Sequence, residues 1–281
     1  MPVEARRFIR KMRGGAQAHL IEAGDGNCYI VKFQNNPQHP RILVNEWIAG
    51  EFLRHLQIAT PAYSLVKITA EFLAANPEVG VNLGSARVAP NAGWHFGSCH
   101  PGHPNTTAVY DVVPDTLLEQ VANLEQFRAV LVFDRWTANA DGRQSIFLRA
   151  QLNDWLARPG IPPRKLGFLT LMIDHGFIFN GPHWDFPQSP LTGLFHRRAV
   201  YAGVKSMDDF EPWLTRIETF PSEVIDQALR RMPTEWLGEL GCDEGNLLRL
   251  LDQLVRRQKR IREILYECRK AEGDPFPKWK E

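Results

Sequence analysis

Short runs of alternating apolar and polar residues fill the first third of the chain and predict β-strands. The turn at residues 24–27, GDGN, separates two of these runs, and a D-G turn in this setting predicts a hairpin. One longer segment, residues 41–57, carries its apolar residues at helical spacing and predicts a helix. The predicted strands cover residues 8–12, 19–22, 28–33, 62–68 and 79–90.

The middle of the chain predicts a loop, a helix and a small sheet. Residues 93–107 are rich in Gly, Pro, His and Asn, which predicts a loop and a boundary close to it. Residues 115–131 have one broad apolar face and predict a helix. Two apolar runs, residues 144–148 and 168–173, predict strands that follow this helix.

From residue 207 onwards the pattern is helical, and its last part predicts one long helix over residues 243–269. The fold class expected from these elements is α+β. We expect a small β-rich N-terminal part with one main helix, residues 1–90, and a mostly helical C-terminal part, residues 91–281. Shorter helices are predicted over residues 208–220, 222–232 and 235–240.

Composition and charge exclude several classes of protein. The 281 residues carry a formal net charge of +1, so nothing indicates direct nucleic-acid binding or a polybasic membrane anchor. No stretch approaches the roughly 18–20 apolar residues of a membrane span, and no N-terminal apolar segment predicts a secretory signal, so we expect a cytoplasmic protein. Four cysteines without a CxxC pair predict reduced thiols. A structural metal held by His95, Cys99, His100 and His103 is the less favoured alternative, because the ligand spacing is irregular.

A lysine inside an apolar strand marks the first candidate site. Lys32 interrupts the run YIVKF, so it either faces solvent at a sheet edge or meets anions in a cleft. Glu46 lies beside the apolar stripe of the predicted helix, where an unpaired carboxylate is costly. We therefore expect an ion pair between Lys32 and Glu46 that positions the lysine for phosphate oxygens, with Glu51 as the rival partner.

A glycine turn precedes this lysine and is typical of an anion-binding cover. Glycines let the backbone approach a ligand closely and direct N–H groups at phosphate. The strand–turn–strand setting matches the cover over ATP phosphates in protein kinases, with an ordinary surface turn as the alternative. The predicted nucleotide-binding residues are Gly14, Gly15, Ala16, Gln17, Lys32 and Glu46, with Ala86 and Val88 as candidates on a connection that bonds the adenine edge.

Three further residues have the spacing of a magnesium–nucleotide site. Asp134 and Asn139 are spaced D-x-x-x-x-N in FDRWTAN, and Asp174 follows an apolar run in IDHG. Mg²⁺ prefers oxygen ligands, so we expect Asn139 and Asp174 to be metal ligands. Asp134 is the candidate to orient and deprotonate an attacking hydroxyl. Together with Lys32 and Glu46, this ordered set predicts a kinase that uses ATP and Mg²⁺.

These motifs also resemble those of the HipA-like kinases. The segments that carry the resemblance are GGAQAHLIEAGDGNCYIVKF, NEWIAGEFLRHLQIATP, FDRWTAN and IDHG, within residues 8–180. The resemblance implies a bilobal protein-kinase-like fold related to the phosphatidylinositol kinases. It implies that the family's G-x-Q turn, ATP lysine, helix glutamate, catalytic aspartate and metal ligands are Gly15 with Gln17, Lys32, Glu46, Asp134, and Asn139 with Asp174.

Two features depart from the family pattern. Trp136 stands where the family often has a histidine, which is expected to alter nucleotide or substrate contacts. About seven residues precede the first predicted strand, whereas the family's toxin carries an additional N-terminal segment. The toxin's role, phosphorylating a serine of an aminoacyl-tRNA synthetase within a toxin–antitoxin pair, is therefore not transferred. The glycine turn holds no serine, so self-inactivation by its phosphorylation is not expected.

The function expected from the sequence is Mg-ATP-dependent transfer of phosphate to a serine or threonine of a protein. Three alternatives stay open: a nucleotide-binding pseudokinase that acts as a regulatory or interaction module, a small-molecule kinase, and transfer of AMP instead of phosphate. The expected partners are a nucleotide, a protein substrate and an antitoxin-like protein, without binding to a membrane.

Overall fold

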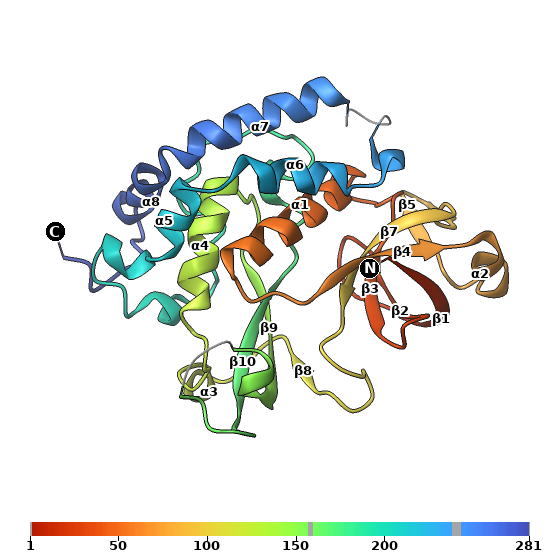
Figure 1. Cartoon of the computed structure of the whole chain (residues 1–281), viewed down its shortest axis with the longest axis horizontal. Helices are drawn as coiled ribbons and strands as arrows, with labels where there is room; N and C mark the ends of the chain where they lie inside the picture. Colours follow the sequence, from red (N-terminus) through yellow and green to blue (C-terminus); the bar gives the residue numbers. More distant parts are fainter. Residues whose placement is uncertain (1, 157–159, 238–242, 281) are drawn as a thin grey trace.

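Five strands from the first 99 residues close into a barrel (Figure 1). In barrel order they are β1 (Val3–Lys11), β2 (His19–Ala23), β3 (Cys28–Lys32), β7 (Gly93–Cys99) and β4 (Tyr63–Ile68). Neighbouring strands are antiparallel except β1 and β4, which pair in parallel. The predicted hairpin of β2 and β3 is confirmed. The computed structural model describes residues 2–156, 160–237 and 243–280.

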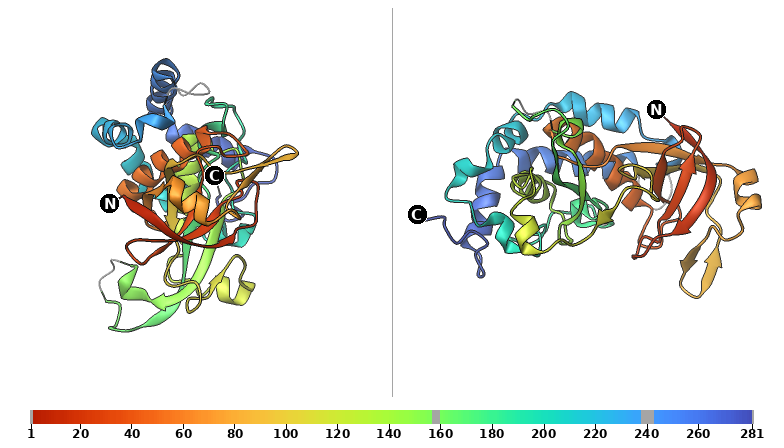
Figure 2. Two further views of the ribbon diagram at one scale, coloured as in Figure 1. Left: turned by 90° about the vertical axis from the view of Figure 1, so that its right-hand side faces the viewer. Right: turned by 90° about the horizontal axis from the view of Figure 1, so that it is seen from below.

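Helix α1 (Arg41–Leu56) lies between the barrel and the helices that follow later in the chain (Figure 1, Figure 2). It matches the helix predicted from the apolar spacing, and its apolar side chains belong to the main core. The helix also packs against α6 (Ser222–Arg230) and β7. Gly50 allows the close approach to β4, because an added Cβ would lie 2.7 Å from the Tyr63 ring. The helix therefore connects the barrel to the C-terminal part.

Strand β7 is the main correction to the predicted elements of the N-terminal part. Residues 93–99 were expected in a loop, but they pair with β3 on one side and β4 on the other. Gly97 is needed there, since an added Cβ would lie 2.5 Å from Val66 Cγ2. The glycines and histidine that predicted a loop are thus packing residues of a central strand. The barrel extends past residue 90, the boundary that the sequence indicated.

A second sheet carries the middle of the chain. It consists of β8 (Val109–Tyr110), β9 (Gln144–Gln151) and β10 (Leu166–Ile173), in the order β10-β9-β8. The helix predicted over residues 115–131 is wrong in its bounds, since the chain forms the short α3 (Asp115–Leu118) and then α4 (Gln126–Thr137). Between them, the Asn123 side chain bonds both backbone groups of Thr170, each at 2.9 Å. These bonds hold the chain against β10, so α4 begins only at Gln126.

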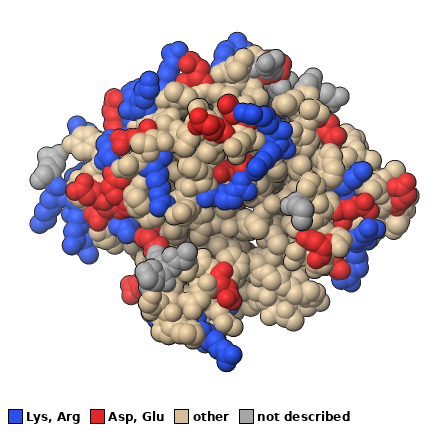
Figure 3. Space-filling view, in the orientation of Figure 1, with Lys and Arg blue, Asp and Glu red and all other residues tan. Residues whose placement is uncertain are grey.

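From residue 207 onwards the described chain is mainly helical, as predicted, with α5 (Trp213–Glu218), α6, α7 (Glu244–Gln258) and α8 (Ile261–Lys270). The helix expected over residues 243–269 is interrupted between α7 and α8. The helix expected over residues 235–240 reaches beyond the described residues, and a 3-10 turn covers Thr234–Trp236. Among the described helices, none has the length and apolar character to cross a membrane. Basic and acidic side chains are interspersed on the face in Figure 3.

A pH-dependent stability follows from His95 in β7. Burial lowers the pKa of this histidine to about 4, and its Nδ1 accepts the Gln34 N–H at 2.9 Å, a bond that protonation removes. Between about pH 6.5 and 4 the unfolded histidine binds a proton that the folded one excludes, so stability is lost as the pH falls. We expect His95 to contribute about 3 kcal/mol to this loss.

Urea unfolding measured across this pH range checks the prediction. His95→Gln should flatten the pH dependence, whereas His103→Gln, at an exposed position, should leave it unchanged. His19 and His175, whose pKa values burial also lowers, keep part of the slope in both variants. An equal slope in the two variants would contradict the assignment to His95.

Candidate active site

Lys32, the last residue of β3, contacts two carboxylates. Its Nζ donates to Glu46 Oε1 at 2.5 Å and to Asp174 Oδ1 at 2.8 Å. Lys32 is 8% exposed and Glu46 is 3% exposed, so both charges are inside the molecule. The expected ion pair between Lys32 and Glu46 is therefore present, while Glu51 pairs with Arg54 and Arg231 instead.

The charges of this cluster support one another. Burial lowers the pKa of Lys32, but the carboxylates of Asp174 and Glu46 outweigh burial and raise it above its ordinary value. Burial raises the pKa of Glu46, and the ammonium of Lys32 opposes that rise. The same ammonium lowers the pKa of Asp174. Lys32 is thus a fixed positive charge next to an ionised aspartate.

Helix α1 also positions the turn that carries Asp174. Glu46 Oε1 accepts the backbone N–H of His175 at 3.1 Å, and Asn45 Nδ2 donates to the Gly176 carbonyl at 2.7 Å. Gly176 permits this contact, since an added Cβ would lie 2.6 Å from Ile42. Asp174 itself has φ +56°, a left-handed conformation that non-glycine residues rarely adopt. The turn is therefore held by α1 on one side, and its aspartate side chain remains 34% exposed.

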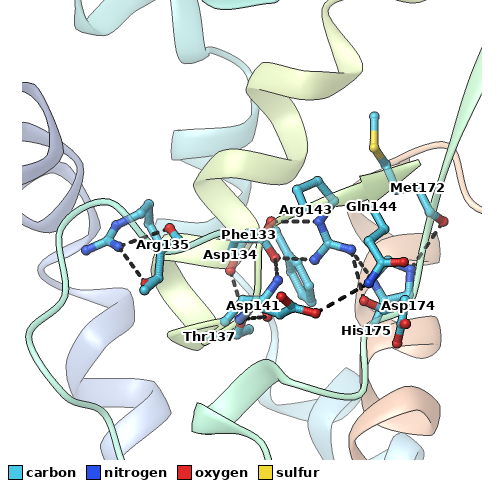
Figure 4. A network of polar contacts seen from close by, with 12 residues as sticks. Phe133, Asp134, Arg135, Thr137, Asp141, Arg143, Gln144, Met172, Asp174 and His175 are labelled. Carbon is cyan, nitrogen blue, oxygen red and sulfur yellow. Dashed lines mark hydrogen bonds and ion pairs between the residues drawn. The ribbon is translucent and has the colours of Figure 1, made fainter. Parts of the chain in front are cut away.

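Asp134, the predicted base, is buried in this structure. Helix α4 continues through this residue, and its carboxylate is 0% exposed. Arg143 Nε donates to Oδ2 at 2.8 Å, and Arg143 Nη2 donates to Oδ1 (Figure 4). Asn139 Nδ2 also donates to Oδ1, at 3.0 Å. An added Cβ on Gly193 would lie 2.6 Å from Asp134 Cβ, so the chain passes directly over the carboxylate. The carboxylate is therefore enclosed in this structure, and its role as the base stays a prediction from the sequence.

Asn139, the predicted metal ligand, is likewise enclosed. Its side chain is 1% exposed, and its amide nitrogen donates to Asp134 Oδ1 at 3.0 Å. Its amide oxygen accepts the backbone N–H of Asp141 at 3.2 Å. The residue follows Ala138, whose left-handed φ of 49° ends α4. Asn139 therefore shapes the loop between α4 and β9.

The exposed carboxylate of this loop belongs to Asp141, a residue that sequence reasoning missed. Its Oδ1 accepts the Gly142 N–H at 2.8 Å, and its Oδ2 accepts from Gln144 Nε2 at 3.3 Å. Gln144 pairs across the sheet with Ile173, the residue before Asp174. Asp141 therefore lies at the sheet edge that carries Asp174. The D-G pair at residues 141–142, one residue before β9, is the sequence signal that marks Asp141.

The predicted glycine turn joins β1 to β2, and its last residue is anchored to a neighbouring hairpin. Gly14 has φ +113°, and Gly15 and Ala16 lead into Gln17, which has φ +48°. The Gln17 side chain exchanges two hydrogen bonds with the backbone of Asn82, at 2.9 and 3.0 Å. The turn is therefore fixed at Gln17, and its glycines are exposed.

Ala86 and Val88 are not brought to the charged cluster. They lie in β6 (Ala86–Val88), which forms a separate two-stranded sheet with β5 (Val81–Leu83). The chain returns from this hairpin into the barrel through β7 and leaves the barrel only after Cys99. The expectation that Ala86 and Val88 lie on the connection between the two parts is therefore wrong.

The cluster of Lys32, Glu46 and Asp174 fits a metal ion that takes most of its ligands from water and phosphate. Among the described residues, no three His, Cys, Asp or Glu side chains are grouped to hold a metal ion by themselves. Mg²⁺ commonly uses one or two carboxylates and completes its shell with water and phosphate oxygens. The partly exposed Asp174, next to the fixed charge of Lys32, meets that requirement.

The chain was compared with protein families, curated proteins and solved structures. A family model described as HipA-like kinase matches residues 6–149, just over half of the chain, a range that contains Lys32, Glu46 and Asp141. No curated protein matches the sequence. The crystal structure of the Golgi casein kinase with Mn/ADP bound is 11% identical, with a TM-score of 0.48, over 96% of this chain and 73% of that one. A second crystal structure of the Golgi casein kinase is 12% identical, with a TM-score of 0.49, over 96% and 74%.

The buried charges of the cluster predict a specific pattern of stability. Lys32→Met leaves Glu46 buried without its ammonium, and breaking a buried ion pair on one side costs about 3 kcal/mol of unfolding free energy. The double variant Lys32→Met/Glu46→Gln removes both charges and should recover at least about 1 kcal/mol. Urea unfolding of the three proteins measures this coupling. Lys67→Met, at an exposed position of β4, is the matched control and should change stability by less than about 0.5 kcal/mol. A double variant less stable than Lys32→Met would show that the pair is not coupled.

Proposed function

This chain belongs to the HipA-like kinase family, and we propose that it transfers phosphate from Mg-ATP to a serine or threonine hydroxyl of a protein. The observation that carries the proposal is the buried Lys32, held between Glu46 and the partly exposed Asp174. Phosphoryl transfer requires positioning and charge neutralisation at the phosphates more than covalent chemistry. A fixed ammonium beside a metal-binding carboxylate supplies both.

The roles follow from these positions. Lys32 binds a phosphate oxygen of the nucleotide, and Asp174 would hold the metal ion. When bound, Mg-ATP supplies the phosphoryl group and the cation that neutralises its developing charge. The glycine turn from Gly14 to Gln17 covers the phosphates with its backbone N–H groups. The adenine is expected at the connection that follows Cys99, where the chain leaves the barrel.

Asp141 takes the place of Asp134 as the acceptor-side carboxylate. It accepts the proton of the acceptor hydroxyl while that oxygen bonds to the γ-phosphorus and the bond to the ADP oxygen breaks. Its exposure and its hydrogen bond to Gln144, which stands opposite Ile173 in the sheet, support this role. Asp134 and Asn139 then form the buried frame of the loop.

This assignment also places the nucleotide between the barrel and the sheet of β9 and β10, as in a bilobal protein-kinase-like fold. The N-terminal part then extends through β7 to Cys99. The nature of the acceptor, beyond a serine or threonine hydroxyl, and an antitoxin-like partner stay predictions from the sequence.

One observation favours a second candidate function. Because Asp134 and Asn139 are enclosed, the residues that the family resemblance assigns to catalysis contact each other and Arg143. A nucleotide-binding module without phosphate transfer would also fit this arrangement. Calorimetric binding of Mg-ADP, together with transfer from γ-labelled ATP to proteins of a host lysate, separates the two functions. Binding without labelled protein supports the module and contradicts the kinase.

Two aspartate variants test the catalytic assignment. We expect Asp141→Asn to lower phosphate transfer at least about 100-fold, because the acceptor proton loses its base, and to leave Mg-ADP binding unchanged. Asp134→Asn should keep transfer within about fivefold when measured below its melting temperature. Initial rates of labelling from γ-labelled ATP and calorimetric ADP binding give both quantities. The opposite order of activities would return the role of base to Asp134.

A further inference from the structure

Arg143 joins two parts of the candidate active site through one buried guanidinium (Figure 4). Its side chain is 0% exposed and forms a two-point ion pair with Asp134 in the last turn of α4. On its other edge, Nη1 donates to the Ile173 carbonyl at 2.8 Å and to the Asp174 carbonyl at 3.3 Å. The guanidinium therefore lies between the end of α4 and the turn that carries Asp174.

His175 completes this contact. Its Nδ1 lies 3.0 Å from Arg143 Nη1, and since a guanidinium only donates, Nδ1 is the acceptor and the ring is neutral. Burial and the charge of Arg143 lower the pKa of His175 well below its ordinary value, which agrees with a neutral ring. The proton on Nε2 is directed at the Met172 carbonyl, 3.3 Å away. Arg143 thus fixes the tautomer of the residue next to Asp174.

The backbone of Asp174 needs such support. A non-glycine residue in the left-handed region costs of order 1–3 kcal/mol and persists only where its surroundings hold it. Asp174 has φ +56°, and the carbonyl groups before and after its Cα both accept from Arg143. The conformation directs the carboxylate to Lys32 Nζ, 2.8 Å away. Arg143 accordingly restrains the turn at the point that sets the direction of this carboxylate.

Arg143 is also close in sequence to Asp141, which connects it to the loop after α4. It follows Asp141 by two residues and directly precedes β9, and its backbone N–H donates to the Leu194 carbonyl at 3.1 Å. The exposed carboxylate of Asp141 and the turn of Asp174 therefore share one rigid anchor. A lysine at this position has no planar fork and cannot serve Asp134 and the two carbonyls in the same way.

We propose that Arg143 is a positioning residue for phosphate transfer, which holds the metal-binding carboxylate of Asp174 and the loop of Asp141 in fixed relative places. This inference rests on the proposed function. A purely structural role would make activity follow stability, because the buried pair with Asp134 is also a folding element. A positioning role predicts that activity and stability separate, since the contacts to residues 173–175 are distinct from the ion pair.

Two variants separate the roles. Asp134→Asn removes the ion pair but keeps the contacts of Arg143 to the Asp174 turn, whereas Asp134→Asn/Arg143→Gln removes both charges together. We expect the double variant to melt at or above the temperature of the single variant, because no charge is left buried alone. We also expect its kcat to be about 30-fold lower than that of the single variant, with an apparent affinity for Mg²⁺ about tenfold weaker, as for other residues that orient a metal ligand. Arg149→Gln, at an exposed position of β9, is the matched control and should change neither quantity.

The measurements are thermal melting, transfer from γ-labelled ATP at varied Mg²⁺, and amide hydrogen exchange of residues 173–176. Faster exchange in the double variant than in Asp134→Asn is the expected result, and it does not depend on phosphate transfer. Kinetics and exchange in the double variant equal to those of Asp134→Asn would overturn the role of Arg143. A wild-type protein that transfers no phosphate would overturn the proposed function instead, and the exchange comparison would still decide the positioning role.

Discussion

A buried charge must be paired, and in this protein the pairing of Lys32 determines how the other parts of the site are arranged. An ammonium group with almost no exposure is stable only beside anions, and Glu46 of α1 and Asp174 after β10 provide them. Glu46 also accepts the His175 N–H, and His175 in turn contacts Arg143, which binds Asp134. One chain of polar contacts therefore runs from the barrel through α1 and the Asp174 turn to α4.

These contacts also separate the two aspartates Asp134 and Asp141. Asp134 is required inside, because the guanidinium of Arg143 is fully buried and needs a carboxylate. Asp141, in the loop that Asn139 shapes, is exposed at the sheet edge, where its carboxylate accepts from the Gly142 N–H and from Gln144 Nε2. The carboxylate of Asp134 thus belongs to a buried ion pair, and that of Asp141 contacts solvent. Asp134 and Asp141 therefore differ in exposure, although both lie in one short segment of the sequence.

Trp136 is a buried residue of the same helix as Asp134. Its position suggested altered nucleotide or substrate contacts, but the side chain is fully buried and its Nε1 donates to the Leu254 carbonyl at 3.0 Å. The ring also packs on Phe52 of α1, with centroids 5.4 Å apart. Trp136 thereby joins α4 to α7 and to α1, and it belongs to the main core. The departure from the family pattern is therefore a packing feature, away from the charged cluster.

Local patterns in the sequence determined the hairpin of β2 and β3, helix α1, the strands β9 and β10, and the pairing of Lys32 with Glu46. Periodicity and the cost of unpaired buried charge depend mainly on near neighbours, so the sequence reveals them. The tertiary structure alone decided that residues 93–99 form a central strand, because Gly97 is explained by its close approach to Val66 and Tyr29 of the neighbouring strands. It also decided where α4 begins, because Asn123 is held by Thr170 of a distant strand. The exposure of Asp141 and the enclosure of Asp134 depend on Arg143 and on Gly193, which passes over the carboxylate. Such contacts join residues that no spacing along the chain relates. The sequence therefore identified Lys32, Glu46 and Asp174 as charges of the candidate site, and only the fold brought out Arg143 and Asp141.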